Sequence, residues 1–182
     1  MPIYISCHQN CVSPENEAAF IASAQASHAG LRSAAGFRWA MLLRSSADAT
    51  RYVALEMWLS RQQANAATPE TSSADEQSYE VATARGSMTP CKFAAFARWS
   101  IDEADKVAFV NQWNSEFHHL EDRMGSRLLQ DLGASSQLSG LHVSNGSALD
   151  PKELAMDFKD ATGLTVRPQT VELLEVVALT EA

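Results

Sequence analysis

Short stretches in which apolar and polar residues alternate recur along the chain, and longer stretches with a helical period separate them. Alternation over roughly four to eight residues is typical of β-strands, whereas apolar residues three or four apart are typical of amphipathic helices. In the first half, the pattern predicts strands at residues 2–12, 37–44, 51–58 and 79–84, a long helix from Pro14 to about Ser33, and a short helix over about 60–67.

The second half repeats this order of elements. The pattern predicts strands at residues 92–100, 127–132, 138–144 and 171–179. A long helix is expected from Asp102 to about Met124, where Gly125 would end it. Its apolar positions are spaced 3, 3, 4, 3 and 4 apart, at Val107, Val110, Trp113, Phe117, Leu120 and Met124. Asp150 and Pro151 are expected to start a second helix that runs to about Ala161.

The element order is therefore β-α-β-β-α-β, found twice. This order predicts an α+β protein with two ferredoxin-like halves, residues 1–88 and 89–182, and the strand order 4-1-3-2 in each. Because a half of about 90 residues buries little core alone, we expect two four-stranded antiparallel sheets to pack face to face within the chain.

Composition and charge narrow the classes of partner. The net charge is −8, from 14 Lys and Arg against 22 Asp and Glu, which disfavours binding to nucleic acids or anionic membranes. No apolar run approaches the roughly 18–20 residues of a membrane span. Three cysteines, without a Cys-x-x-Cys pair, fit a reducing compartment better than a disulfide framework. We expect a cytoplasmic protein that needs neither nucleic acid nor membrane, and a homodimer is compatible with this interpretation.

Strand alternation gathers a set of polar and aromatic residues on one face of the first half. Neighbouring side chains in a strand point to opposite faces, and the first and third strands are neighbours in the 4-1-3-2 order. The face expected under the helices would carry residues of both strands, and His28 of the long helix could approach it. The candidate site residues on this face are Tyr4, His8, Asn10, His28, Tyr52, Glu56 and Trp58.

These residue types suit proton removal from an aromatic substrate. A His8–Glu56 pair could take an acidic phenol or enol proton, so both are candidate catalytic residues. Tyr52 and Trp58 would supply flat apolar walls, and Tyr4, Asn10 and His28 would help to bind the substrate. An alternative is purely structural, because Glu56 could hydrogen-bond a loop while Trp58 fills the core.

Other histidines in the chain give weaker signals. His118 and His119 are flanked by acidic residues, but the helical wheel turns both away from the apolar face, which favours a solvated surface over a metal site. His142 is a lone histidine on an expected strand, and such residues more often serve packing than ligand binding. The sequence contains no glycine-rich phosphate loop and no nucleophile elbow, so nucleotide cofactors and hydrolase chemistry are not supported.

Two segments of the first half carry a resemblance to a known family. Gly36-Phe37-Arg38-Trp39 leads one strand, and the next ends in Leu55-Glu56-Met57-Trp58-Leu59-Ser60, a Glu-x-Trp-x-Ser pattern before a short helix. This combination resembles the antibiotic biosynthesis monooxygenase family over most of the first half. The second half resembles it only in element order. The resemblance implies a dimeric α+β barrel, here formed within one chain.

The resemblance also implies a range of activities. Members include cofactor-free oxygenases of anthrones, quinol oxygenases and haem-degrading enzymes. The haem degraders use an Asn on the first strand, a Trp on the third and a His on the following helix. Trp58 matches the Trp and Asn10 or His8 lies near the first position, but residues 61–67 contain no His. We therefore expect no haem, no metal and no other cofactor.

The sequence leaves two functions open. One is a cofactor-independent monooxygenase acting on a small aromatic or quinol-type substrate, with His8 or Glu56 as the base. The other is a non-catalytic module of the same fold that binds a small hydrophobic molecule or serves assembly.

Overall fold

The computed structural model describes residues 2–67, 76–118, 124–146 and 149–182. It is an α+β structure in which the chain forms two compact units. Unit 1 comprises Met1–Glu80 and Glu175–Ala182, and unit 2 comprises Val81–Leu174. The last eight residues therefore complete the unit that the first eighty begin. The predicted halves, residues 1–88 and 89–182, were defined by the repeated order of elements and not by contacts. This division stays a prediction.

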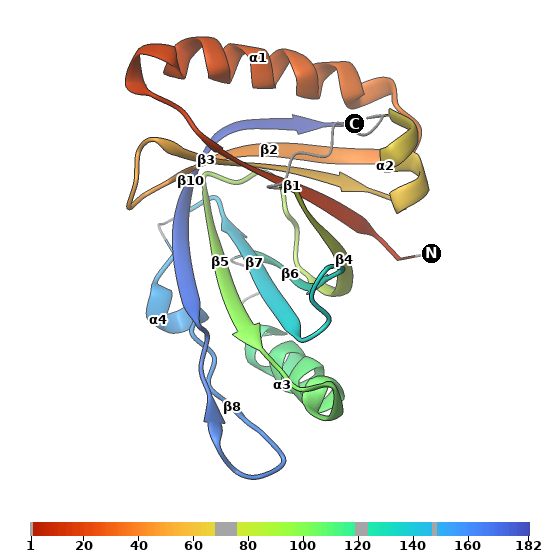
Figure 1. Cartoon of the computed structure of the whole chain (residues 1–182), viewed down its shortest axis with the longest axis vertical. Helices are drawn as coiled ribbons and strands as arrows, with labels where there is room; N and C mark the ends of the chain where they lie inside the picture. The colour runs from red at the N-terminus through yellow and green to blue at the C-terminus, as the bar shows by residue number, and fades with distance from the viewer. Residues whose placement is uncertain (1, 68–75, 119–123, 147–148) are drawn as a thin grey trace. The chain divides into compact units, whose positions relative to one another are not determined.

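Unit 1 is built around a sheet with its long helix on one face (Figure 1). In chain order its elements are β1 (Tyr4–Cys11), the 3-10 helix η1 (Pro14–Asn16), α1 (Glu17–Gly30), the 3-10 helix η2 (Leu31–Ser33), β2 (Phe37–Ser45), β3 (Arg51–Trp58), α2 (Arg61–Ala67) and the first half of β4 (Glu76–Arg85).

Unit 2 repeats the strand–helix–strand–strand order and adds a short hairpin. After the second half of β4 its elements are β5 (Phe93–Ser100), the 3-10 helix η3 (Glu103–Asp105), α3 (Lys106–His118), β6 (Met124–Asp131), β7 (Gln137–Ser144), α4 (Pro151–Leu154), β8 (Phe158–Lys159), β9 (Thr165–Val166) and the first part of β10 (Thr170–Glu181).

Eight strands in the described part of the chain form one closed antiparallel barrel, in the order β1-β3-β2-β10-β5-β7-β6-β4. This order contains β4-β1-β3-β2 and β10-β5-β7-β6, so the predicted 4-1-3-2 arrangement and the α+β ferredoxin-like fold class are confirmed. The expectation of two separate sheets packed face to face was wrong. The fourth strands, β4 with 10 residues and β10 with 12, are longer than the others and continue the hydrogen bonding into a single ring.

The strands and helices of unit 1 form largely where the apolar pattern predicts them. β3 spans the predicted residues 51–58, and β1 and β2 differ from prediction by one or two residues at their ends. The connection into β2 depends on Gly36, whose φ is +84° and whose position leaves no space for a Cβ beside Gln63. A glycine is favoured there because only glycine adopts positive φ without steric cost.

The long helix of unit 2 differs from the prediction. The described part of α3 runs to His118, and Met124, expected as its last apolar position, is instead the first residue of β6, where it pairs with Ser144. Gly125 therefore lies within a strand. The buried face of α3 is Phe109, Trp113 and Phe117, and Val107 is 74% exposed. At about 100° per residue, Val107 lies roughly 200° from Phe109, which turns it away from that face. Leu120 lies outside the described residues.

The second helix of this unit is also shorter than predicted. Asp150 does cap α4, since its carboxylate accepts a hydrogen bond from the Lys152 backbone amide at 2.9 Å. The helix nevertheless ends at Leu154, and the β8–β9 hairpin replaces its remainder. The hairpin forms because Asp160 accepts from the backbone amides of Thr162 and Leu164, while Gly163 takes a φ of +83° at the turn.

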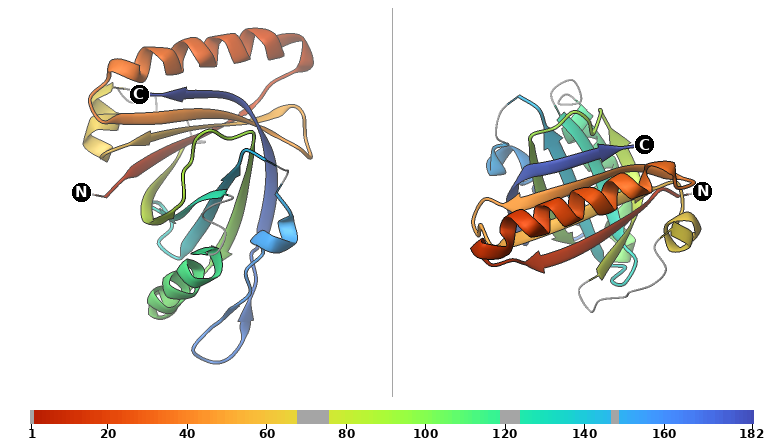
Figure 2. Two further views of the ribbon diagram at one scale, coloured as in Figure 1. Left: turned by 180° about the vertical axis from the view of Figure 1, so that it is seen from behind. Right: turned by 90° about the horizontal axis from the view of Figure 1, so that it is seen from above.

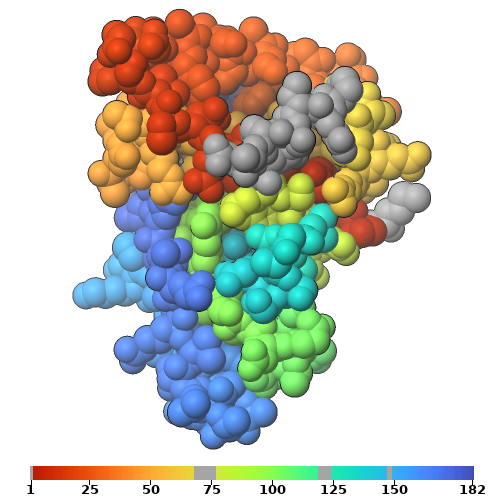
Figure 3. Space-filling model, viewed as in Figure 1, coloured from red at the N-terminus to blue at the C-terminus, as the bar shows by residue number. Residues whose placement is uncertain are grey.

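Figure 2 shows from above that α1 runs along the sheet of unit 1. The space-filling view shows the side chains of α1, in red and orange, as a continuous layer on that unit (Figure 3). Among the helices that the structure describes, none combines the length and the apolar character of a membrane-crossing segment.

Candidate functional site

The register of unit 1 brings most of the predicted site residues side by side. β1 and β3 are antiparallel neighbours, and the residues of their helix-facing sides meet in four cross-strand rows. The pairs are Tyr4 with Trp58, Ser6 with Glu56, His8 with Ala54, and Asn10 with Tyr52. The predicted neighbourhood of the two polar stripes is therefore present, while the roles assigned to these residues stay predictions.

Helix α1 covers this face and is about as long as the strand beneath it. The 14 residues of α1 are about 21 Å long at 1.5 Å each, and the strand from Asn10 to Tyr4 spans about 20 Å. At one end, Phe20 meets Tyr52 edge to face, with ring centroids 5.2 Å apart. At the other end, Leu31 packs against the cluster that contains Tyr4 and Trp58. The helix therefore spans the rows from end to end.

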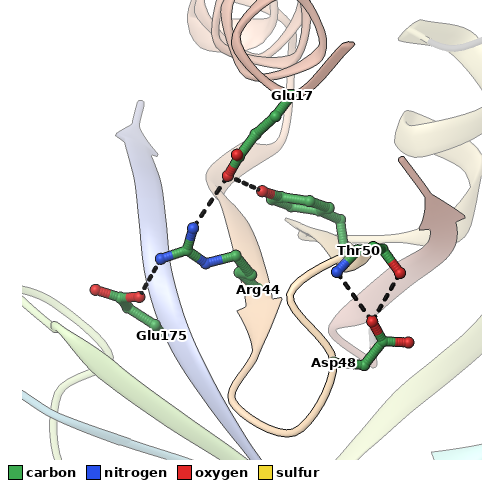
Figure 4. A network of polar contacts seen from close by, with 6 residues as sticks. Glu17, Arg44, Asp48, Thr50 and Glu175 are labelled. Atoms are coloured by element: carbon green, nitrogen blue, oxygen red, sulfur yellow. Dashed lines mark hydrogen bonds and ion pairs between the residues drawn. The ribbon is translucent and has the colours of Figure 1, made fainter. Parts of the chain in front are cut away.

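A charged network fastens the start of α1 to the sheet. The Tyr52 hydroxyl donates to Glu17 Oε1 at 2.5 Å, and Arg44 of β2 donates to the same oxygen at 3.0 Å. Arg44 also donates to Glu175 of β10 at 2.7 Å, so one guanidinium joins two carboxylates (Figure 4). Next to this network, Asp48 accepts from the amide and hydroxyl of Thr50 and closes the β2–β3 turn.

The network explains the protonation of its members. The hydrogen bond from Tyr52, followed by the contact with Arg44, lowers the pKa of Glu17 despite some desolvation. Burial, together with the bond to Glu17, raises the pKa of Tyr52. Tyr52 was predicted to be a wall of the site, but its hydroxyl holds α1 in place. Glu17, Arg44 and Glu175 were missed, because residues up to 131 positions apart carry no shared sequence signal.

The covered face also holds polar atoms that the fold leaves unpaired. Within the described residues, Ser6 Oγ, His28 Nδ1 and Trp58 Nε1 are buried and have no hydrogen-bond partner. Each belongs to a side chain that is no more than 5% exposed. An unpaired buried polar atom costs about 1–3 kcal/mol, so three on one face are unusual for a site that serves packing alone.

His28 is the buried residue of α1, whereas the sequence predicted only that it could approach this face. Burial lowers its pKa, and the Coulombic interaction with His8 lowers it further. The imidazole of His28 is consequently neutral at physiological pH and carries one lone pair that can accept a proton. His8 itself is only partly buried.

The remaining predicted site residues lie on the same face of β1 and β3. Glu56 is 8% exposed and stands between Ser6 of β1 and Ala40 of β2. Small residues therefore flank the carboxylate in both neighbouring strands. Trp58 packs edge to face on Phe37 at 5.3 Å, and the Tyr4 hydroxyl is 2.8 Å from Ser78 Oγ. Asn10 is partly exposed at the end of the face that Tyr52 closes.

Metal-ligating side chains do not gather elsewhere in the part of the chain that the structure describes. No group of three or more His, Cys, Asp or Glu residues lies within reach of one ion there. His118 is exposed at the end of α3, as the helical wheel predicted. His119 lies outside the described residues.

One known family matches the segment of the chain that contains this face. Residues 8–71 match the model of the antibiotic biosynthesis monooxygenase family. This segment is similar to that family. The match extends from the middle of β1 beyond the end of α2, and it includes α1, β2 and β3. The predicted resemblance is thereby confirmed, on the half that carries Glu-x-Trp-x-Ser.

Solved structures resemble the whole chain in fold. A provisionally named monooxygenase from Fusobacterium nucleatum has a TM-score of 0.74 at 12% identity, with 99% of this chain and 94% of that chain covered. One from Lactobacillus acidophilus has a TM-score of 0.68 at 9% identity, with 99% and 96% covered. An anthrone oxidase-like protein reaches 0.65 at 10% identity, with 100% and 93% covered. At such identities the likeness establishes the fold alone. No curated protein matches the sequence.

Proposed function

We propose that the chain is a cofactor-independent monooxygenase whose small aromatic substrate, of the anthrone or quinol type, binds between α1 and the helix-facing side of β1 and β3. The observation that carries this proposal is the set of buried, unpaired polar atoms on that face, at Ser6, His28 and Trp58 among the described residues. A bound molecule with oxygen substituents would pair these atoms and recover the cost of burying them.

The aromatic residues of the face favour a flat substrate. Trp58 and Phe37 form one end, and Phe20 and Tyr52 form the other. Between them the rows carry the small side chains Ser6, Ala40 and Ala54. Large rings at the ends and small residues in the middle suit a planar molecule held at its edges.

Proton removal is the step that the protein would supply. An anthrone or quinol becomes reactive towards dioxygen when it loses a proton and becomes electron-rich. His8 or Glu56 acts as the base, as the sequence predicts, and the neutral imidazole of His28 is a third group able to take a proton. Trp58 and Tyr4 position the ring, and Asn10 contacts its outer edge.

The overall reaction balances without an added reductant. An anthrone reacts with dioxygen to give an anthraquinone and water. One oxygen atom becomes the new carbonyl oxygen, the other leaves as water with two substrate hydrogens, and the substrate supplies the electrons. The family match and the structural neighbours named as monooxygenases support this class of reaction.

The second candidate is a binding module of the same fold. The unpaired atoms that favour a ligand would be satisfied equally by a molecule that undergoes no reaction. Fold likeness cannot separate these two functions, because one fold often hosts unrelated activities.

Oxygen uptake separates the two candidates. We expect wild-type protein to consume dioxygen with anthrones or hydroquinones, and we expect Glu56→Gln or His8→Gln to lower turnover by about 10²–10⁴-fold. Gln25→Ala, on the exposed side of α1, is the matched control and should retain full turnover. Saturable binding without oxygen uptake would favour the binding module. Full turnover in both Gln variants would exclude His8 and Glu56 as the base.

A further inference from the structure

A second set of buried polar and aromatic groups lies in unit 2, under α3. His142 of β7 is fully buried, with Ala95 of β5 on one side and Ser126 of β6 on the other. Two rings of α3 lie close to its imidazole. The Phe117 ring centroid is 4.5 Å away at 43°, and the Trp113 centroid is 5.9 Å away at 31°. The imidazole is therefore held within an aromatic setting.

One nitrogen of this imidazole is paired and the other is not. His142 Nδ1 lies 2.9 Å from Ser126 Oγ, which fixes the orientation of the ring. Among the residues that the structure describes, His142 Nε2 has no hydrogen-bond partner, and neither does Trp113 Nε1. Both atoms are fully buried, so each loses its interaction with water and gains nothing within the unit.

The backbone of a glycine lies close to the unpaired nitrogen. Gly140 lies two residues before His142 on the same face of β7, and a Cβ built on it would be 2.6 Å from His142 Nε2. The same point is 3.3 Å from Cζ3 of Trp99. His142 Nε2 thus lies over a residue without a side chain and beside a third aromatic ring. Glycine inside a strand often marks such a close approach.

The chemistry of these groups defines what could pair with them. Burial lowers the pKa of His142 to about 3, so the ring is neutral at physiological pH. A neutral imidazole beside a serine can offer either an N–H or a lone pair at Nε2, whereas an indole N–H only donates. An aromatic hydroxyl fulfils both requirements, since it accepts from one group and donates to or accepts from the other. The groups facing His142 are uncharged, which disfavours an ionic ligand.

The position of His142 matches that of Glu56 in unit 1. Each is the sixth residue of an eight-residue third strand, and each has a small residue or a serine opposite it in both neighbouring strands. Each faces the long helix of its own unit. The sequence pattern did not reveal this equivalence, because it lies in the strand register and not in matching letters.

We propose that unit 2 contains a binding site of its own for a small neutral aromatic molecule with a hydroxyl group, a phenol, which pairs with His142 Nε2 and Trp113 Nε1 between the rings of Trp99, Trp113 and Phe117. Ser126 is the positioning residue, since it holds the imidazole by Nδ1. The proposal does not rest on the monooxygenase activity of unit 1, because all of these residues belong to unit 2.

Nuclear magnetic resonance of the full-length protein tests the site with phenol as the probe. The resonances of the His142 ring nitrogens and of the Trp113 indole N–H are followed during the titration. Two matched probes serve as controls: toluene, which lacks the hydroxyl group, and cyclohexanol, which lacks the flat aromatic ring. We expect phenol to shift both resonances with saturation. Toluene should bind roughly 25-fold to 100-fold more weakly, because it loses two hydrogen bonds and each loss weakens binding by about fivefold to tenfold.

Variants link the shifts to the site. Gly140→Ala, which places a methyl group beside His142 Nε2, and His142→Phe should each weaken phenol binding by at least about tenfold while circular dichroism shows a folded protein. Glu56→Gln in unit 1 should leave the His142 shifts unchanged. Unmoved His142 resonances in wild-type protein would overturn the proposal without any variant. So would shifts confined to Trp58 of unit 1, or equal phenol affinity in His142→Phe.

Discussion

Two histidines illustrate how the setting of a single residue determines its chemistry. His28 on α1 and His142 on β7 are both buried, and burial lowers the pKa of each. His8, which is only partly buried, was ranked above both from the sequence. Alternation along a strand shows which face a side chain occupies, but it does not show how much solvent the covering helix removes. The burial of these two histidines therefore had to be found in the structure.

The pKa of His142 leads to a prediction about acid stability. The folded protein holds this group neutral down to about pH 3, whereas the unfolded chain binds its proton near pH 6.5. Between these values the unfolded state binds more protons, so stability is lost as the pH falls, by up to about 1.4 kcal/mol per pH unit. Thermal unfolding of wild type and His142→Phe between pH 7 and pH 4 should diverge, with wild type losing more. Parallel curves would contradict the assignment.

At the scale of elements, the sequence predicts the strands better than the helices. β3 has the predicted bounds, and the strand order follows from the β-α-β-β-α-β pattern. The helix failures have a common cause, since apolar residues suit a strand as well as a helix. Met124 continues the spacing of α3 yet belongs to β6, and Phe158 packs on Phe109 from a hairpin and not from a helix. Tertiary pairing, which the local pattern does not contain, decides both.

The site was predictable only where it depends on alternation. Tyr4, His8, Asn10, Tyr52, Glu56 and Trp58 share a face because strand geometry requires it. The network of Glu17, Arg44 and Glu175 joins three elements that are distant in sequence. No local spacing connects such residues, so only the fold reveals them.

The network makes α1 the element on which the site depends most. Tyr52→Phe keeps the ring that packs on Phe20 but removes the hydrogen bond to Glu17. We expect the pKa of Glu17 to rise towards its ordinary value of 4.5, since that bond is the main cause of its lowering. The first-turn amides of α1 should also exchange hydrogen faster. Carboxyl titration and hydrogen exchange by nuclear magnetic resonance measure both effects.

Gln25→Ala, on the exposed side of the same helix, is the control and should alter neither quantity. An unchanged Glu17 pKa in Tyr52→Phe would show that the hydroxyl does not hold the helix. Because a lowered carboxyl pKa stabilises the fold only above the ordinary value, wild type should also lose this contribution as the pH falls below about 4.5.

At the scale of the whole molecule, the end of the chain belongs to the unit that its beginning forms. The backbone amide of Ala182 donates to the Arg38 carbonyl at 3.0 Å, and Glu175 binds Arg44. Residues 175–182 thus complete the unit that contains the family-like segment, although the family match ends at residue 71. The family pattern alone would not have identified this contribution.

Replacing residues 175–182 by a Gly-Ser segment of equal length tests this dependence. We expect unit 1 to lose stability, because it loses the pairing of β10 and the ion pair at Arg44. Trp39 and Trp58 report on unit 1, and Trp99 and Trp113 report on unit 2. The indole resonances of the first pair should broaden or vanish before those of the second on warming. Unchanged Trp39 and Trp58 signals would refute the dependence.

Labelled dioxygen tests the proposed monooxygenase activity most directly. Wild-type protein, incubated with an anthrone under ¹⁸O₂, should release an anthraquinone that carries one ¹⁸O atom, while the second labelled atom appears in water. The rate should fall by about 10²–10⁴-fold when the base is removed. A quinone without label, or no quinone above the rate of the uncatalysed reaction, would contradict the account.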